Sequence, residues 1–267
     1  MLCVRKGVAP TVAGAPAPGE ISPLVRLLAA PADAGDRTSY AVTPRQASAV
    51  RLVDAFSGWK AGRDYLEGYE NGGLPGLAAD VSAVLRHGVG AKPIDGTSES
   101  MRTVARRHCL SALQRMSAVS EDCATRLAGE AGLIELVAQL VSVGCLRPAP
   151  GDRARADTGT VRFASALLLN LVVGLAHLKA KGGGGGGSLS LYDDASSLRD
   201  VCGALCRIME EDAPLGREAE ADRWGRRYAA AAMYAFVADP QVRKACTDTS
   251  RGKRPFARAK PMYLCGG

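Results

Sequence analysis

The chain has 267 residues, a formal net charge of +7 and only 5% aromatic residues. That length is enough to bury a sizeable core, and the scarcity of aromatic side chains disfavours a large β-structured core and favours an all-α fold. The excess of basic residues indicates either an acidic partner or surface, or a charge that only keeps the protein soluble.

The first elements are a tail and two helices. Residues 1–20 are rich in Pro, Ala and Gly, which predicts disorder, and residues 21–30 predict a short apolar helix with Pro23 in its first turn. Thr43 followed by Pro44 predicts an N-cap and the first position of the next helix. Helical spacing places four apolar residues on one face of that helix: Ala47, Val50, Val53 and Phe56.

A three-part plan then recurs: a short helix, a glycine turn and second helix, and a loop followed by a longer third helix. The clearest unit has helices at 121–131, 133–143 and 160–175, with its turn at Gly132. The unit before it is expected at 61–69, 77–87 and 99–119 with a turn at 72–73, and the unit after it at 175–181, 197–211 and 218–237, followed by a partial unit from 239.

The third helices of these units share a register. They place one apolar residue at corresponding points about 60, 55 and 65 residues apart, namely Phe56, Met116, Leu171 and Phe236. Helical units repeated at such intervals are typical of an α-solenoid. The sequence therefore predicts an α-solenoid over residues 21–249, followed by a basic disordered tail over 250–267.

Two stretches, one rich in glycine and one apolar, are superficially similar to elements of other protein classes. The glycine run 182–187 predicts a flexible insert at 182–190, because a phosphate-binding loop needs a Gly-Lys-Ser/Thr ending and a preceding strand. The longest apolar stretch, 163–178, contains Ser165, Asn170 and His177 and is expected to be too short and too polar to span a bilayer. No N-terminal secretory signal is expected.

Consecutive segments carry a resemblance to a known family: ARRHCLSALQRMS (105–117), AGEAGLIELVAQLV (128–141) and VRFASALLLNLVV (161–173). In this order they resemble the LisH-containing armadillo-repeat proteins of ciliary basal bodies and centrioles, and AVRLVDAFSGWKAGRDYL (49–66) is similar to the segment upstream in that family. The resemblance covers about residues 45–240, and it implies that the solenoid over residues 21–249 is armadillo/HEAT-like, with a right-handed superhelix. It implies a scaffold in the cytoplasm and cytoskeleton, at the basal body or centriole, without catalytic residues.

The family's LisH motif and coiled coil have no counterpart in these residues. We expect a C-terminal fragment, a truncated gene product or a divergent relative, and the dimerisation that LisH provides is not implied. A general cytosolic armadillo/HEAT adaptor is therefore an alternative. A basic nucleic-acid-binding repeat protein is a second, although regular 35-residue units with repeated base-reading side chains are missing.

Peptide-binding armadillo proteins clamp an extended backbone with a ladder of asparagines on their third helices. Here Asn170 stands alone, because the aligned positions hold Ala55, Arg115 and Ala235. We predict that Asn170 bridges neighbouring units through a buried hydrogen bond rather than contacting a ligand.

Arginines form a more regular pattern on these helices. Arg107, Arg162 and Arg227 stand eight residues before Arg115, Asn170 and Ala235, and Arg51 and Arg115 are expected on the same face. Stacked units would align them into a basic stripe that suits an acidic helix or tail of a protein partner. The alternative is a solvated face whose arginines pair with Glu99, Glu218 or Asp222. The predicted partner-binding residues are Arg107, Arg115, Arg162, Asn170 and Arg227.

No residue set predicts catalysis, a metal or a cofactor. His87, His108 and His177 are isolated in the sequence. Cys202 and Cys206 lack a second pair at zinc spacing and are expected to pack in the core, and the scattered cysteines favour free thiols in a reducing compartment. No Ser/His/Asp or paired-carboxylate set has a recognisable context. Two tryptophans, Trp59 and Trp224, are expected to pack helices together.

Overall fold

The computed structural model describes residues 23–28, 42–69, 72–90, 96–144, 158–180, 195–210 and 219–244. These residues form helices joined by turns, with no strand among them. The predicted all-α class is therefore confirmed for the described part of the chain. The predicted disordered ends, 1–20 and 250–267, and the predicted insert at 182–190 lie outside the described residues.

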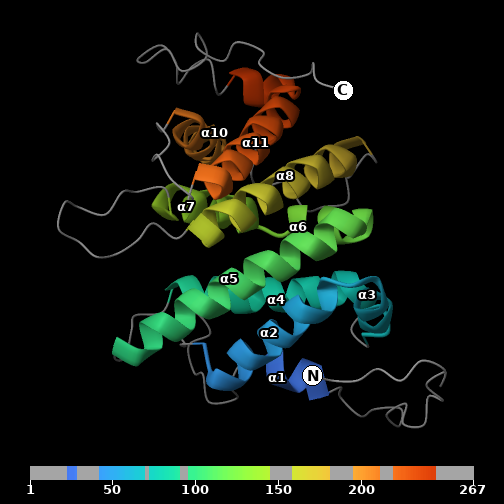
Figure 1. Cartoon of the computed structure of the whole chain (residues 1–267). Helices are drawn as coiled ribbons and strands as arrows, with labels where there is room; N and C mark the ends of the chain where they lie inside the picture. Colours follow the sequence, from blue (N-terminus) through green and yellow to red (C-terminus); the bar gives the residue numbers. More distant parts are fainter. Residues whose placement is uncertain are drawn as a thin grey trace.

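The helices follow the predicted order along the chain (Figure 1). Their bounds are α1 (Pro23–Leu28), α2 (Pro44–Ser57), α3 (Lys60–Leu66), α4 (Gly73–Gly90), α5 (Gly96–Val119), α6 (Glu121–Ala128), α7 (Leu133–Gly144), α8 (Thr158–Ala180), α10 (Ala195–Glu210) and α11 (Ala219–Val237). A further helical turn covers residues 240–244, where the partial unit was expected.

Local signals set several of these boundaries. Thr43 caps α2 as predicted: its hydroxyl accepts from the backbone N–H of Gln46, and the Gln46 side chain accepts from the backbone N–H of Thr43. Such a capping box satisfies two amide groups that a helix start leaves unpaired. The predicted turns at Gly72 and Gly132 are also confirmed, with φ of 95° and 74°, a region that residues with a Cβ rarely adopt.

Several helix bounds differ from the prediction by three or four residues, as at the start of α4, and the division predicted inside α8 is wrong. The sequence predicted a third helix ending at residue 175 and a separate short helix at 175–181, but α8 continues without interruption to Ala180. Leu175 is buried, and Leu178 lies against Gly129 at the end of α6. The last turns of α8 therefore bury apolar side chains against α6, which favours one continuous helix over a turn.

Helix α8 is apolar over most of its length. Its residues Gly159–Ala180 are long and apolar enough, by length and composition alone, to cross a membrane, a property that the core helix of a soluble protein can share. In the structure this helix packs against α5, α6, α7 and α11, and 56% of its most apolar window is buried. A helix with neighbours on several sides needs apolar residues around much of its circumference.

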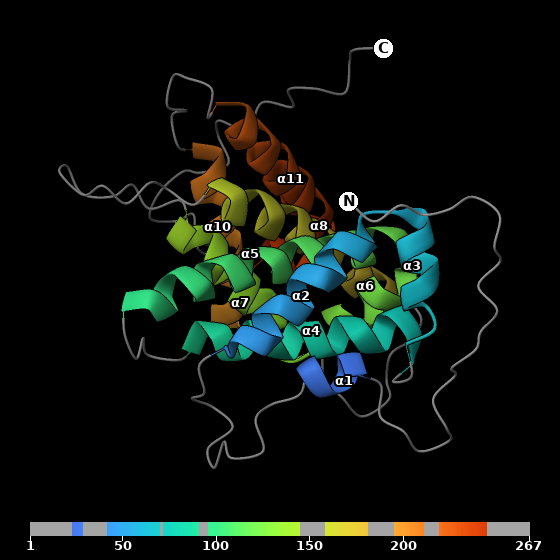
Figure 2. The same ribbon diagram turned by 60° about the horizontal axis from the view of Figure 1, so that its bottom comes forward.

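The long helices pack in sequence along the molecule. Helix α2 packs against α5, α5 against α8, and α8 against α11, and Figure 1 shows them following one another from blue to red. A second row accompanies them, with α4 against α5, α7 against α8, and α10 against both α11 and α7, as the turned view also shows (Figure 2). The short helices α1 and α3 pack on α2, and α6 packs on α8, α4 and α5.

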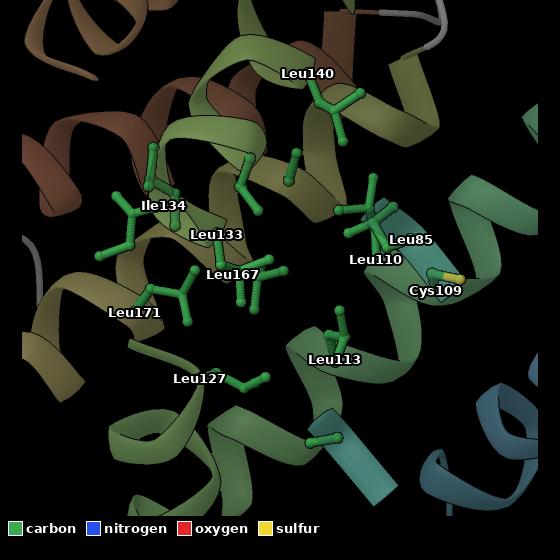
Figure 3. Close-up of a cluster of buried hydrophobic side chains, with 14 of the residues drawn as sticks. Leu85, Cys109, Leu110, Leu113, Leu127, Leu133, Ile134, Leu140, Leu167 and Leu171 are labelled. Atoms are coloured by element: carbon green, nitrogen blue, oxygen red, sulfur yellow. The ribbon is translucent and has the colours of Figure 1, made fainter. Parts of the chain in front are cut away.

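A continuous apolar core joins the two rows (Figure 3). Leu110 and Leu113 of α5, Leu133 and Ile134 of α7 and Leu167 of α8 are each at most 2% exposed. Burial of one such side chain contributes about 1.5–3 kcal/mol. The core therefore determines how the successive long helices stack, and so where their outward side chains lie.

A polar bridge ties α4 to the end of α6. Glu130 Oε2 accepts hydrogen bonds from Ser82 Oγ at 2.6 Å and Arg86 Nη2 at 2.8 Å. Burial raises the pKa of Glu130 above its usual range, although the Ser82 and Arg86 groups act in the opposite direction. Paired in this way, the carboxylate is tolerated beside the core.

Candidate partner-binding face

Three of the predicted arginines lie on the outside of successive packed helices. Arg107 of α5, Arg162 of α8 and Arg227 of α11 are all exposed, and we call these three residues the arginine face. Gly159, at the start of α8, adjoins Arg107, since a Cβ added there would lie 3.0 Å from Arg107 Nε. A Cβ at Gly225 of α11 would lie 3.6 Å from Val161 Cγ1 of α8. The turns that carry the three arginines are therefore neighbours.

Two of these arginines rest on aromatic rings of their own helix. The guanidinium carbon of Arg162 lies 6.0 Å from the centre of the Phe163 ring, and that of Arg227 lies 5.2 Å from the Trp224 ring. Trp224 in turn stacks on Tyr228, with ring centres 5.9 Å apart. Guanidinium groups stacked in this way keep the N–H edge of the planar fork available to a carboxylate or phosphate.

Neither Arg162 nor Arg227 has a carboxylate partner among the described residues. Arg107, by contrast, already interacts with another group of the chain, so it is not counted as an unpaired arginine. The side chains of Glu99, Glu218 and Asp222, the acidic partners of the alternative prediction, lie outside the described residues.

A sequence signal for this face was present but not used in the prediction. Each of its arginines is followed directly by a ring residue, namely His108, Phe163 or Tyr228, and all three rings are half-buried. This Arg–ring pair recurs at equivalent places in α5, α8 and α11, and α2 lacks it because Arg51 is followed by Leu52. Trp224, on which Arg227 stacks, stands three residues before it. The residues three positions before Arg107 and Arg162 are Val104 and Gly159, so those two arginines have no aromatic ring at that position.

Arg115 has a different role, because it is bound to Asp54. Its Nη1 donates to Asp54 Oδ1 at 2.9 Å and to the Asp54 backbone carbonyl at 2.7 Å, and His108 Nδ1 lies 2.7 Å from Asp54 Oδ2. The Asp54 side chain is only 13% exposed. These contacts join α2 to α5, so Arg115 serves the packing of two long helices. The prediction of an isolated His108 is wrong, since its partner stands 54 residues earlier.

Asn170 also joins two long helices, as predicted. Its Nδ2 donates to the backbone carbonyl of Gln114 at 3.1 Å and to Ser117 Oγ at 2.9 Å, which links α8 to α5. The amide is half-buried. Among the five predicted partner-binding residues, Arg115 and Asn170 thus hold the helices together, whereas Arg107, Arg162 and Arg227 point outward.

Asn170→Ala is expected to lower the free energy of unfolding by about 1–2 kcal/mol, because the Gln114 carbonyl and Ser117 hydroxyl lose a half-buried donor. Urea unfolding followed by circular dichroism measures this change. Gln139→Ala, which truncates an exposed residue of α7, is the matched control and should stay within about 0.5 kcal/mol of the unmodified chain. Equal midpoints for the two variants would show that the Asn170 bridge does not stabilise the fold.

The two tryptophans differ in exposure. Trp59 is 68% exposed, in the corner between α2 and α3, and Tyr65 beside that corner is 72% exposed. Trp224 is 38% exposed and contacts residues of its own helix. The prediction that Trp59 packs helices together is therefore wrong, whereas for Trp224 it stays a prediction.

The cysteines that the structure describes are buried or half-buried. Cys109 and Cys123 are free and buried, and burial raises the pKa of the Cys123 thiol to about 11 and that of Cys109 further. Cys202 is buried as predicted but is one half of a disulfide, so the expected free thiol is wrong there. No group of three or more His, Cys, Asp or Glu residues among those described could hold a metal ion.

Comparison with known proteins identifies no family for this chain. A proposal about function therefore rests on the arginine face and on the order in which the helices pack. The likeness to LisH-containing armadillo proteins rests only on the order of the sequence segments. No protein-family model matches the chain, and neither does any curated protein or any solved structure.

Proposed function

We propose that this chain is a non-enzymatic protein-interaction scaffold, and that its arginine face binds an acidic segment of a partner protein. The observation that carries the proposal is the pair Arg162 and Arg227: both are exposed, both are stacked on a ring, and neither has a carboxylate partner in the described residues. A guanidinium fork forms short, charge-assisted hydrogen bonds with carboxylates, often two at a time.

The proposal includes an armadillo-type superhelical solenoid. Its support is the packing order, in which α2, α5, α8 and α11 follow one another while α4, α7 and α10 form a second row. Stacked helical units, each in contact mainly with its neighbours, produce such an order. Asn170 and Arg115 add polar links between successive long helices.

The proposed place of action is the ciliary basal body or centriole, in cilium assembly or signalling. This part rests on the resemblance of residues 45–240 to the LisH-containing armadillo proteins. A fluorescently tagged chain in ciliated cells should concentrate at basal bodies marked by a centriolar protein. A diffuse cytosolic signal would instead favour a general adaptor unrelated to cilia.

Reversing the charge of the face is expected to abolish partner capture. The variant R107E/R162E/R227E should retain at most about a tenth of the proteins that the unmodified chain captures from a ciliated-cell extract, because a carboxylate is repelled where it was attracted. The matched control is R26E/R45E/R199E, which changes three exposed arginines on α1, α2 and α10 and alters the net charge equally. Equal capture by both variants would remove the arginine face from the proposal.

Nucleic-acid binding is a second candidate, favoured by the stack of Arg227, Trp224 and Tyr228. Exposed aromatic rings beside arginines are the surfaces on which single-stranded bases stack. Filter binding of a single-stranded RNA decides between the two functions. Retention that falls steeply with salt and disappears in R162E/R227E would favour nucleic acid, and the absence of retention would remove this candidate.

A further inference from the structure

Each later long helix turns one side toward the long helix before it. Arg115 joins α5 to α2, Asn170 joins α8 to α5, and Gly225 of α11 lies against α8. Residues three or seven positions apart in a helix lie on the same side of it. These contacts therefore identify the side of α5, α8 and α11 that faces backward along the stack.

The centre of this backward side is fully buried in all three helices. Its central residue is Ala112 in α5, Leu167 in α8 and Ala232 in α11, and each of them is 0% exposed. The residue at the same register position of α2 is Leu52, which is 50% exposed. The difference arises because α2 packs against α5, α1 and α3, and no long helix of the described residues precedes it. The stack of long helices therefore ends at α2 with an unfilled place.

The unfilled place extends along α2 with the spacing of a helix-packing surface. Arg45, Ser48, Leu52 and Ala55 follow one another at intervals of three or four residues, and all four are exposed. We call these four residues the open face of α2. Trp59 continues the same spacing just beyond the helix and is 68% exposed. Such a stripe fits another helix laid along it, because side chains at these intervals interdigitate with those of a second helix.

Aromatic rings widen the apolar part of this surface. Phe56 stands one turn after Leu52, and its ring centre lies 5.6 Å from that of Tyr65 in α3. Tyr65 is 72% exposed. Large apolar side chains that are exposed together mark interaction sites, and aromatic rings contribute strongly to interface energies. The end of the open face near α3 therefore offers a docking place for the apolar side of a helix.

The charge of the open face indicates which helix fits it. Arg45 and the neighbouring Arg51 are exposed, and neither has a carboxylate partner among the described residues. A second copy that stacked its α11 on this face would bring Arg227 toward Arg45, because Arg107, the equivalent of Arg227 in α5, adjoins Gly159 at the start of the next long helix. Like charges disfavour that pairing, whereas carboxylates on the docked helix favour binding.

We infer that the open face of α2 binds an acidic amphipathic helix of a partner protein, laid where a preceding long helix would lie. Its apolar side packs on Leu52 and Trp59, and its carboxylates pair with Arg45 and Arg51. This site lies on another helix than the arginine face and goes beyond the proposed function.

The complex is expected to be weak. One helix on one side of α2 covers less than the roughly 1,600 Å² of a standard stable interface, so we expect a Kd of about 10 μM. Such a complex is lost in the washes of an extract capture, and the test therefore measures binding at equilibrium in solution.

Fluorescence anisotropy on the full chain tests the inference with three labelled synthetic helices, each about three heptads long. The Leu/Glu helix carries leucines at the a and d positions of each heptad and glutamates at the e and g positions, so its own charges keep it from dimerising. The scrambled helix has the same composition with leucines spread around the helix, and the Leu/Lys helix has lysine in place of glutamate. The Leu/Glu helix is expected to bind about tenfold tighter than either of the others.

Variants of the open face should weaken this binding. Leu52→Asp and R45E/R51E are each expected to weaken binding of the Leu/Glu helix about tenfold, because the first removes the apolar anchor and the second repels the carboxylates. Val173→Asp, at an exposed valine of α8, is the matched control for Leu52→Asp and should stay within about twofold. R45E/R51E is expected in turn to bind the Leu/Lys helix about tenfold tighter than the unmodified chain does, a gain that requires a folded surface.

The matched charge control is R162E/R227E on the arginine face, which should leave binding of the Leu/Glu helix within about twofold. Binding that is lost in R162E/R227E and kept in Leu52→Asp would overturn the inference and leave the proposed function standing, since the arginine face would then hold the acidic helix. Equal binding of the scrambled helix would overturn the amphipathic ligand. In sedimentation velocity, a mass that rises with concentration and returns to that of a monomer in Leu52→Asp would overturn the partner helix in favour of a second copy.

Discussion

Gly174→Ala is expected to destabilise the chain by about 3 kcal/mol, as a severe case of overpacking. A Cβ at this position would lie 2.5 Å from the backbone oxygen of Ala124 and 2.6 Å from its carbonyl carbon. Both atoms belong to the backbone of α6, so no change of side-chain rotamer can relieve the clash. Helices α6 and α8 would have to separate, and the core between them would lose contact. Urea unfolding followed by circular dichroism measures the loss.

Gly203→Ala in α10 is the matched control. Nothing lies within 4 Å of a Cβ added there, and the residue is in a helix, so alanine should stabilise the chain by about 0.4–1 kcal/mol through the lower entropy of the unfolded state. The two variants make the same chemical change with opposite expected signs. If Gly174→Ala shifted the urea midpoint no more than Gly203→Ala, the close approach of α6 to α8 would be refuted.

Asp54→Ala is expected to cost about 2 kcal/mol. Arg115 loses an acceptor at 2.9 Å and His108 loses its partner at 2.7 Å, and hydrogen bonds to charged groups are each worth about 1.5–3 kcal/mol. The side chains of Arg115 and His108 are 38% and 29% exposed, so water replaces part of what is lost. The unfolding midpoint in urea should fall without a change in the slope of the transition.

The control for Asp54 is Asp64→Ala, which breaks the exposed pair of Lys60 and Asp64 on α3. Both substitutions place alanine in a helix, so the change in helix propensity cancels between them. Because the Asp64 and Lys60 side chains are 64% and 86% exposed, the effect should stay within about 0.5 kcal/mol. A double-mutant cycle of Asp54→Ala with Arg115→Ala should show a coupling energy of about 1 kcal/mol or more, and additive effects would disprove the link.

Stability and partner binding should respond to different substitutions. Asp54 and Asn170 hold α2 to α5 and α5 to α8, so their variants should unfold at lower urea and still capture the acidic partner once folded. Arg162 and Arg227 carry no such link in the described residues, so their variants should lose that capture with little change in the midpoint. Measuring both properties on each variant therefore tests the division of roles along these helices.

Sequence reasoning located the helices because the signals for them are local. The capping box of Thr43 and Gln46 and the left-handed turn at Gly132 depend on residues within a few positions of each other. The apolar faces of the helices follow from the helical period for the same reason. The register of the long helices likewise placed Arg107, Arg162 and Arg227 at equivalent positions.

Tertiary contacts decided the rest. The bonds of Asp54 to His108 and Arg115 span 54 and 61 residues, and no local pattern indicates which residues the stacking of helices will bring together. The sequence around Gly174 does not indicate that the backbone of α6 packs against this glycine. It also does not indicate that α8 continues past Leu175. The sequence by itself determined which residues form helices and which sides of them are apolar, because backbone geometry and periodicity act over a few residues. Which arginines stay outward and which become links between helices was decided only when the helices packed, because each partner is supplied by another helix.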